Sequence, residues 1–171
     1  MTFSADTVCL PDVNVWIANV WIAAASDRHE HHAAARLWFD SASGPVCFCR
    51  LTQMAFLRLL TNPRIMSEDI LSPAEAIAVY RQLFSDERVR FEAEPPNLEN
   101  AWVSLMSMHS ASGSTWTDAY LAAFAMEAKF HLISFDRGMR RWSGLALELL
   151  IPAWRSRLHH GHLGISDRLS E

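Results

Sequence analysis

The amino-acid sequence predicts an α/β fold in which helices cover both faces of a central parallel sheet. Helical segments alternate along the chain with short apolar runs, as in successive strand–helix units. The apolar runs are nearly continuous, as expected for strands that are buried on both faces. Half of the 171 residues are hydrophobic, which is enough for the core of one domain of this length.

Five short apolar runs are predicted strands, because each is bounded by turn-forming or polar residues. The clearest boundaries are Ser43-Gly44-Pro45 and Glu94-Pro95-Pro96. The predicted strands are residues 7–12, 46–51, 88–93, 131–135 and 146–150.

Helical spacing of apolar residues and N-terminal capping signals predict the helices between the strands. Thr52 is a predicted N-cap. Ser72, followed by Pro73 and by Glu75 three residues on, resembles a capping box with proline at the first helical position. The predicted helices are residues 15–25, 29–42, 53–60, 73–84, 97–108 and 115–129, with a short helical turn at 138–142.

These elements predict one domain over residues 1–151. Residues 152–171 differ, because they are rich in arginine and histidine and contain little core material. We interpret them as a basic C-terminal tail.

The N-terminus lacks a basic segment followed by an apolar one, so no secretion signal is expected. No apolar run approaches the ~20 residues of a membrane span, because Asn14 and Asn19 interrupt the longest. The three cysteines lie in apolar stretches, and their odd number indicates reduced, buried thiols. The sequence therefore predicts a cytoplasmic protein without a membrane partner.

The net charge of −4 means that the overall field does not attract nucleic acid. Any RNA binding must use a local basic patch or a bound metal ion. Arginines near predicted strand ends could supply that patch, although surface salt bridges explain them equally well. The candidates are Arg58, Arg64, Arg137, Arg140 and Arg141.

Three aspartates are expected at one edge of the sheet. Asp12 and Asp136 each follow an apolar strand, and ligands of parallel α/β sheets bind at the carboxyl ends of the strands. Asp118 lies in the first turn of a predicted helix, whose N-terminus can face the same edge. Carboxylates gathered in one place repel each other unless a cation binds, and Mg²⁺ prefers carboxylate oxygens together with retained waters.

Each aspartate also has a simpler explanation. Asp12 can cap the helix that follows it, and Asp118 suits the dipole of its helix. Asp136 can form a turn. Asn14 could hydrogen-bond the Asp12 carboxylate or a water bound there, and helix capping explains it equally well. Taken together, the three aspartates favour a site.

The sequence resembles PIN-domain proteins, in particular VapC-type ribonuclease toxins of toxin–antitoxin pairs, over about residues 8–150. The resemblance rests on the ordered segments LPDVNV at 10–15, LTQ at 51–53, FLR at 56–58, TDAYL at 117–121 and SFDR at 134–137. It implies an α/β/α sandwich and a Mg²⁺ or Mn²⁺ site that cleaves RNA. It also implies growth inhibition relieved by a cognate antitoxin, and frequent homodimerisation.

On this resemblance, Asp12, Asp118 and Asp136 match the family's acidic metal positions, and Asn14 and Thr117 match its supporting polar positions. One feature departs from the pattern. The family usually carries a glutamate at the start of the helix after the second strand, where this chain has no acid. That glutamate corresponds to either Gln53 or Ala55. Gln53 could orient a water or bind a metal through its amide oxygen, or it could be an ordinary helix-start residue.

The leading functional hypothesis is a Mg²⁺-dependent endoribonuclease, the toxin of a VapBC-type pair. RNA as substrate comes from the resemblance and not from residue spacing. The alternative hypothesis is a protein of the same fold with weakened catalytic activity, which acts as an RNA-binding or antitoxin-binding module. A third hypothesis is a phosphatase with Asp12 as covalent nucleophile, although such enzymes commonly carry a second aspartate where this chain has Asn14.

Overall fold

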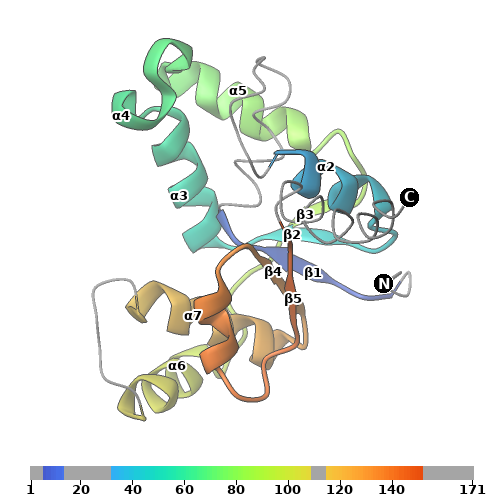
Figure 1. The fold of residues 1–171 in the computed structure, drawn as a ribbon, viewed down its shortest axis with the longest axis vertical. Helices are drawn as coiled ribbons and strands as arrows, with labels where there is room; N and C mark the ends of the chain where they lie inside the picture. Colours follow the sequence, from blue (N-terminus) through green and yellow to red (C-terminus); the bar gives the residue numbers. More distant parts are fainter. Residues whose placement is uncertain (1–5, 14–31, 109–114, 152–171) are drawn as a thin grey trace, which may run out of the picture.

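The computed structural model of the chain describes residues 6–13, 32–108 and 115–151. Within them, five parallel strands form one sheet in the order β3-β2-β1-β4-β5. β1 therefore lies at the centre, between β2 and β4 (Figure 1). The strands are β1 (Cys9–Pro11), β2 (Val46–Phe48), β3 (Val89–Phe91), β4 (His131–Ser134) and β5 (Leu147–Leu149).

The helices form a layer on each side of the sheet (Figure 1). Helices α2 to α5 lie on one side, and α6 and α7 lie on the other. The α-helices are α2 (His32–Ser41), α3 (Arg50–Leu60), α4 (Pro63–Met66), α5 (Pro73–Leu83), α6 (Leu98–Ser107) and α7 (Thr115–Ala128). Two 3₁₀ helices are η1 (Ser67–Asp69) and η2 (Arg137–Arg141).

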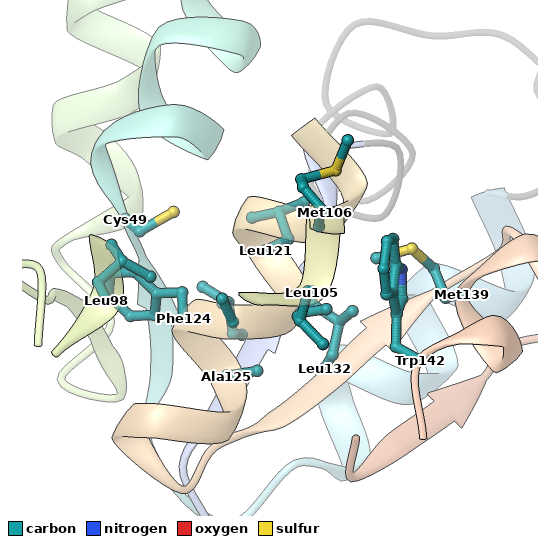
Figure 2. Close-up of a cluster of buried hydrophobic side chains, with 14 residues drawn as sticks. Cys49, Leu98, Leu105, Met106, Leu121, Phe124, Ala125, Leu132, Met139 and Trp142 are labelled. Atoms are coloured by element: carbon teal, nitrogen blue, oxygen red, sulfur yellow. The ribbon is translucent and has the colours of Figure 1, made fainter. Parts of the chain in front are cut away.

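Successive strand residues are buried in opposite layers, because side chains alternate across a strand. In β1, Cys9 packs with the α2–α5 layer, whereas Leu10 packs with α6 and α7. In β4, Leu132 contributes to the core under α6 and α7, and Ile133 to the other core. Figure 2 shows the core under α6 and α7, in which Leu132 lies among side chains of α6, α7 and η2. The predicted α/β/α sandwich with a parallel sheet is confirmed.

The capping box predicted at the start of α5 is confirmed. The Ser72 backbone N–H donates to Glu75 Oε2 (2.8 Å), and the Glu75 N–H donates to Ser72 Oγ (3.3 Å). This hydrogen bonding from Ser72 lowers the pKa of Glu75. Pro73 follows as the first helical residue.

The predicted N-cap of the next helix upstream is wrong. Helix α3 begins at Arg50 with Cys49 as its N-cap, and Thr52 is its third residue. The Thr52 hydroxyl accepts a hydrogen bond from the Cys49 N–H (3.0 Å). Thr52 therefore satisfies an N-terminal backbone donor from inside the first turn, which is the N3 role of a capping box.

Other boundaries differ slightly, and two short helices were not predicted. The strands are shorter than expected, and α4 and η1 fill the segment after Asn62. Asn62 Oδ1 accepts from the Arg64 N–H (2.9 Å), so the same Asn-Pro pair that ends α3 starts α4. The predicted helix at 15–25 and the tail at 152–171 lie outside the described residues.

The described part of the chain contains no helix long and apolar enough to cross a membrane. Cys9, Cys47 and Cys49 are buried free thiols, as predicted. Burial raises the pKa of the Cys9 thiol to about 11, so it stays protonated at neutral pH.

Candidate active site

Two aspartates follow adjacent strands at the carboxyl edge of the sheet. Pro11 at the end of β1 lies in register with Ile133 of β4. The Asp12 N–H continues this pairing by donating to the Ile133 carbonyl (2.8 Å). Asp12 is buried (8% exposed), and Asp136 follows β4 by two residues. The strand pairing itself therefore sets these two residues at the same edge of the sheet.

Ser134, the last residue of β4, connects the two aspartates. Its buried hydroxyl donates to Asp12 Oδ2 (2.9 Å) and accepts from the Asp136 N–H (2.9 Å). Ser134 thus fixes the Asp12 carboxylate relative to the Asp136 backbone. Our site prediction missed it, although a serine in an otherwise apolar strand was a usable signal.

Asp136 is held by the turn that starts η2. It is the N-cap of η2, and its Oδ1 accepts from the Gly138 N–H (2.7 Å). A Cβ at position 138 would lie 3.0 Å from Asp136 Oδ1 and 2.6 Å from Arg141 Nη2. Only glycine fits this close approach without displacing one of the two side chains.

Asp118 enters from the first turn of α7 and faces the η2 segment. Its Oδ2 lies 3.8 Å from Arg141 Nη2, and Arg141 Nε donates to the Gly138 carbonyl (2.8 Å). Burial raises the pKa of Asp118, the negative charge of Asp136 raises it further, and Arg141 opposes both effects. Arg141 therefore does not fully offset the effects of burial and of Asp136 on the Asp118 carboxylate.

A cavity of about 500 Å³ joins these groups. Four of the predicted site residues line it, namely Asp12, Thr117, Asp118 and Asp136. Its opposite wall is α3, which contributes mostly uncharged side chains and one cation. The α3 residues are Leu51, Thr52, Met54, Ala55 and Arg58.

Gln53 is not brought to this cavity. It lines a different one, together with Tyr80 and Phe91. Of the two positions considered for the family's glutamate, Ala55 faces the carboxylates and Gln53 does not. The predicted contribution of Gln53 to a metal site therefore has no geometric support. Asn14 lies outside the described residues.

A cation in this cavity would have few protein ligands. Among the described residues, no three His, Cys, Asp or Glu side chains are close enough to hold a metal ion as they stand. Asp118 and Asp136 nevertheless repel each other in a partly buried place. A divalent cation that retains several waters would relieve that repulsion.

These features define an α/β/α protein with an acidic cavity at the carboxyl edge of a parallel sheet. Comparison with known proteins narrows this class. The PIN domain family matches residues 18–145, most of the chain. The chain belongs to the PIN-domain family, as the sequence resemblance predicted. The match begins after Asp12, so the assignment of that residue to the site rests on the geometry of β1 and β4.

Named relatives are VapC proteins. Ribonuclease VapC41 of Mycobacterium tuberculosis is 38% identical over 138 residues, which cover 77% of this chain and 94% of the relative. The crystal structure of M. tuberculosis VapC20, described as a sarcin-ricin loop cleaving toxin, has a TM-score of 0.60 at 16% identity and covers 81% of this chain and 97% of that one. VapBC2 from Rickettsia felis, bound to a promoter DNA fragment, has a TM-score of 0.60 at 9% identity, covering 85% and 100%. The solved structures support the fold alone.

Proposed function

We propose that this chain is a metal-dependent endoribonuclease and the toxin of a VapBC-type toxin–antitoxin pair. The observation that carries the proposal is the gathering of Asp12, Asp118 and Asp136 around one cavity. The similarity to a relative named as a ribonuclease supports RNA as the substrate.

Asp12, Asp118 and Asp136 are the residues that would hold Mg²⁺ or Mn²⁺. A bound divalent ion would supply an activated water and would stabilise negative charge on the phosphodiester oxygens. Asp118 and Asp136 offer carboxylate oxygens, which hard cations prefer. Ser134 holds Asp12 in place through its hydrogen bond.

Other side chains position the RNA. Arg58 is exposed and lines the cavity opposite the carboxylates, where it binds a backbone phosphate. Thr117 lines the cavity beside Asp118 and can hydrogen-bond a ribose or phosphate oxygen. Leu51, Met54 and Leu121 give the cavity an apolar surface, which limits the water around the reacting phosphate.

The partners follow from the same assignment. A cognate antitoxin protein would bind and silence the toxin, and proteins of the same fold include structures described as VapBC2 and VapBC-1. A homodimer and a cytoplasmic location belong to the same proposal. Exposed apolar side chains such as Val103 on α6 and Trp116 on α7 are available for contact with a second copy.

The direct test is cleavage of a single-stranded RNA by the purified protein, with Mg²⁺ or with EDTA. We expect cleavage only with Mg²⁺, and its loss in Asp12→Asn. Asp69→Asn is the matched control, because Asp69 is an exposed aspartate of η1 that does not line the acidic cavity. Cleavage that persists in EDTA or in Asp12→Asn would contradict the proposal.

The weakened binding module remains a second candidate, because α3 lines the acidic cavity with Ala55, an uncharged residue at one of the two positions considered for the family's glutamate. An added carboxylate there should strengthen the site. We expect Ala55→Glu to bind Mg²⁺ about tenfold more tightly, since affinity for hard cations rises with the number of charged ligands. The measurement is the Mg²⁺ concentration dependence of the melting temperature. Ala55→Gln is the control for side-chain size. Wild-type protein that binds RNA but never cleaves it, with cleavage appearing in Ala55→Glu, would favour the second candidate.

A further inference from the structure

A second cavity, of about 270 Å³, lies beside α3 and is lined by residues that do not line the acidic cavity. It is lined by Arg50, Gln53, Tyr80, Arg81, Phe84 and Phe91. Arg50 and Gln53 are three residues apart and share one face of α3. Leu51, Met54, Ala55 and Arg58 of the same helix line the acidic cavity. Helix α3 is therefore the wall between the two cavities.

Gln53 holds Arg50 in the second cavity. Arg50 Nη1 donates to Gln53 Oε1, and Tyr80 lines the same cavity. The Arg50 guanidinium lies over the Phe91 ring, 4.7 Å from its centroid. An arginine fixed by an amide and an aromatic ring is already oriented for a ligand.

Tyr80 and Phe84 of this cavity pack against the core, whereas Phe84 and Phe91 remain open to solvent. The Phe84 ring stacks on fully buried Phe48, with centroids 6.2 Å apart and an interplanar angle of 19°. Tyr80 packs edge-on against Phe84 at 5.0 Å. Phe84 and Phe91 are still 36% and 37% exposed. Rigid, exposed rings of this kind offer a flat surface to a nucleobase.

The charge of the cavity points to an anionic ligand. None of the described residues that line it is acidic. Over residues 6–13, 32–108 and 115–151, Arg36, Arg88 and Arg141 each lie within 4 Å of an aspartate oxygen, whereas no such ion pair involves Arg50 or Arg81. In a chain with a net charge of −4, two arginines left without acidic partners form a local cationic site.

We propose that this second cavity binds a nucleotide of the same RNA strand whose reacting phosphate lies in the acidic cavity. One base stacks on Phe84 and Phe91, and neighbouring phosphates contact Arg50 and Arg81. A strand needs only to cross α3, a helix roughly 10 Å wide, to occupy both cavities. The inference rests on the proposed function for the identity of the ligand, and it adds the part of the site that grips RNA away from the cut.

The test measures RNA binding without cleavage, so that it stands apart from the test of catalysis. A fluorescent, mixed-sequence single-stranded oligoribonucleotide is titrated with the full chain in EDTA, at several salt concentrations. We expect Arg50→Gln/Arg81→Gln to weaken binding about tenfold. The slope of log affinity against log salt should fall by about 1.4, since each phosphate contact to a single strand contributes about 0.7. Arg36→Gln/Arg90→Gln is the matched control, because both side chains are exposed and neither lines this cavity.

Phe84→Leu separates stacking from charge, because Phe84 lines the cavity whereas the ring under the Arg50 guanidinium is Phe91. It keeps an apolar side chain but removes the aromatic face, so binding should weaken by about fivefold or more while the salt slope stays unchanged. Circular dichroism of each variant checks that it is folded.

Three outcomes would overturn the proposal. The first is wild-type protein that does not bind the oligoribonucleotide. The second is an arginine double variant that matches its control in both affinity and salt slope. The third is a double variant that binds RNA normally but is monomeric where the wild type is dimeric, because the cavity would then be a protein interface.

Discussion

The charged side chains at the two ends of the sheet differ in how they are paired. At the amino end, Asp86 and Arg88 precede β3 and pair closely, with Arg88 Nη2 2.6 Å from Asp86 Oδ2. Arg88 Nη1 also donates to the carbonyls of Phe39 (2.9 Å) and Ala42 (2.6 Å) at the end of α2. At the carboxyl end, Asp118 and Asp136 repel each other, and Arg141 Nη2 lies 3.8 Å from Asp118 Oδ2.

The pKa directions record the same difference. Hydrogen bonding from Arg88 lowers the pKa of Asp86, whereas burial and the charge of Asp136 raise the pKa of Asp118. Charges at the amino end therefore stabilise the fold. At the carboxyl end the ionised form of Asp118 is disfavoured, which is the expected arrangement of a site whose ligand supplies the missing charge.

The largest expected effect tests the carboxyl end. Asp118→Asn should reduce RNA cleavage by more than the ~10–100-fold that loss of an outer-shell partner costs, because it removes a predicted metal ligand. In EDTA its melting temperature should equal or exceed that of the wild type, since ionised Asp118 is disfavoured. Cleavage assays and thermal unfolding measure both. A variant that unfolds at a lower temperature in EDTA would mean that Asp118 is a structural residue.

The converse variant tests the amino end. Arg88→Gln should lower the free energy of unfolding by about 2 kcal/mol, because charged hydrogen bonds to Asp86 and to two partly buried carbonyls are lost. Its cleavage rate should match that of the wild type at a temperature where both are folded. Urea denaturation gives the stability. A large loss of activity in folded Arg88→Gln would break the proposed division between the two ends.

The smallest effect is a pH dependence at the amino end. The pKa of Asp86 is lowered in the folded state, so its contribution to stability is fully present above the usual aspartate pKa of about 3.9. That contribution is lost as the pH falls through the lowered pKa. The effect is small because the pair is partly exposed and screened by solvent. Urea midpoints measured between pH 5 and about 2.5 should fall less steeply in Arg88→Gln than in the wild type, and equal slopes would contradict this origin.

The sequence predicted the features that local pattern determines. Asp12 and Asp136 could be placed on one edge because each follows an apolar strand, and parallel strands bring their carboxyl ends together. Ser72 and Glu75 could be assigned because a capping box is complete within four residues.

The features that were missed depend on distant packing. The sequence alone did not decide whether Gln53 or Ala55 faces the aspartates. The burial of Thr52, Phe56 and Leu60 sets the rotation of α3, and this rotation turns Ala55 toward the carboxylates. Ser134 acts through Asp12, which is 122 residues away in the chain. Both relations depend on tertiary packing, although the serine within an apolar strand was itself a usable signal.

The central place of β1 sets an order of assembly. Asp12 directly follows β1, yet its hydrogen-bond partner Ser134 ends β4. A growing polypeptide that has not yet emerged beyond β4 has every helix up to α7 available but no means of fixing Asp12 beside Asp136. Any activity of this pocket is therefore a late event in biosynthesis, and truncated translation products that stop before residue 131 are expected to be inert.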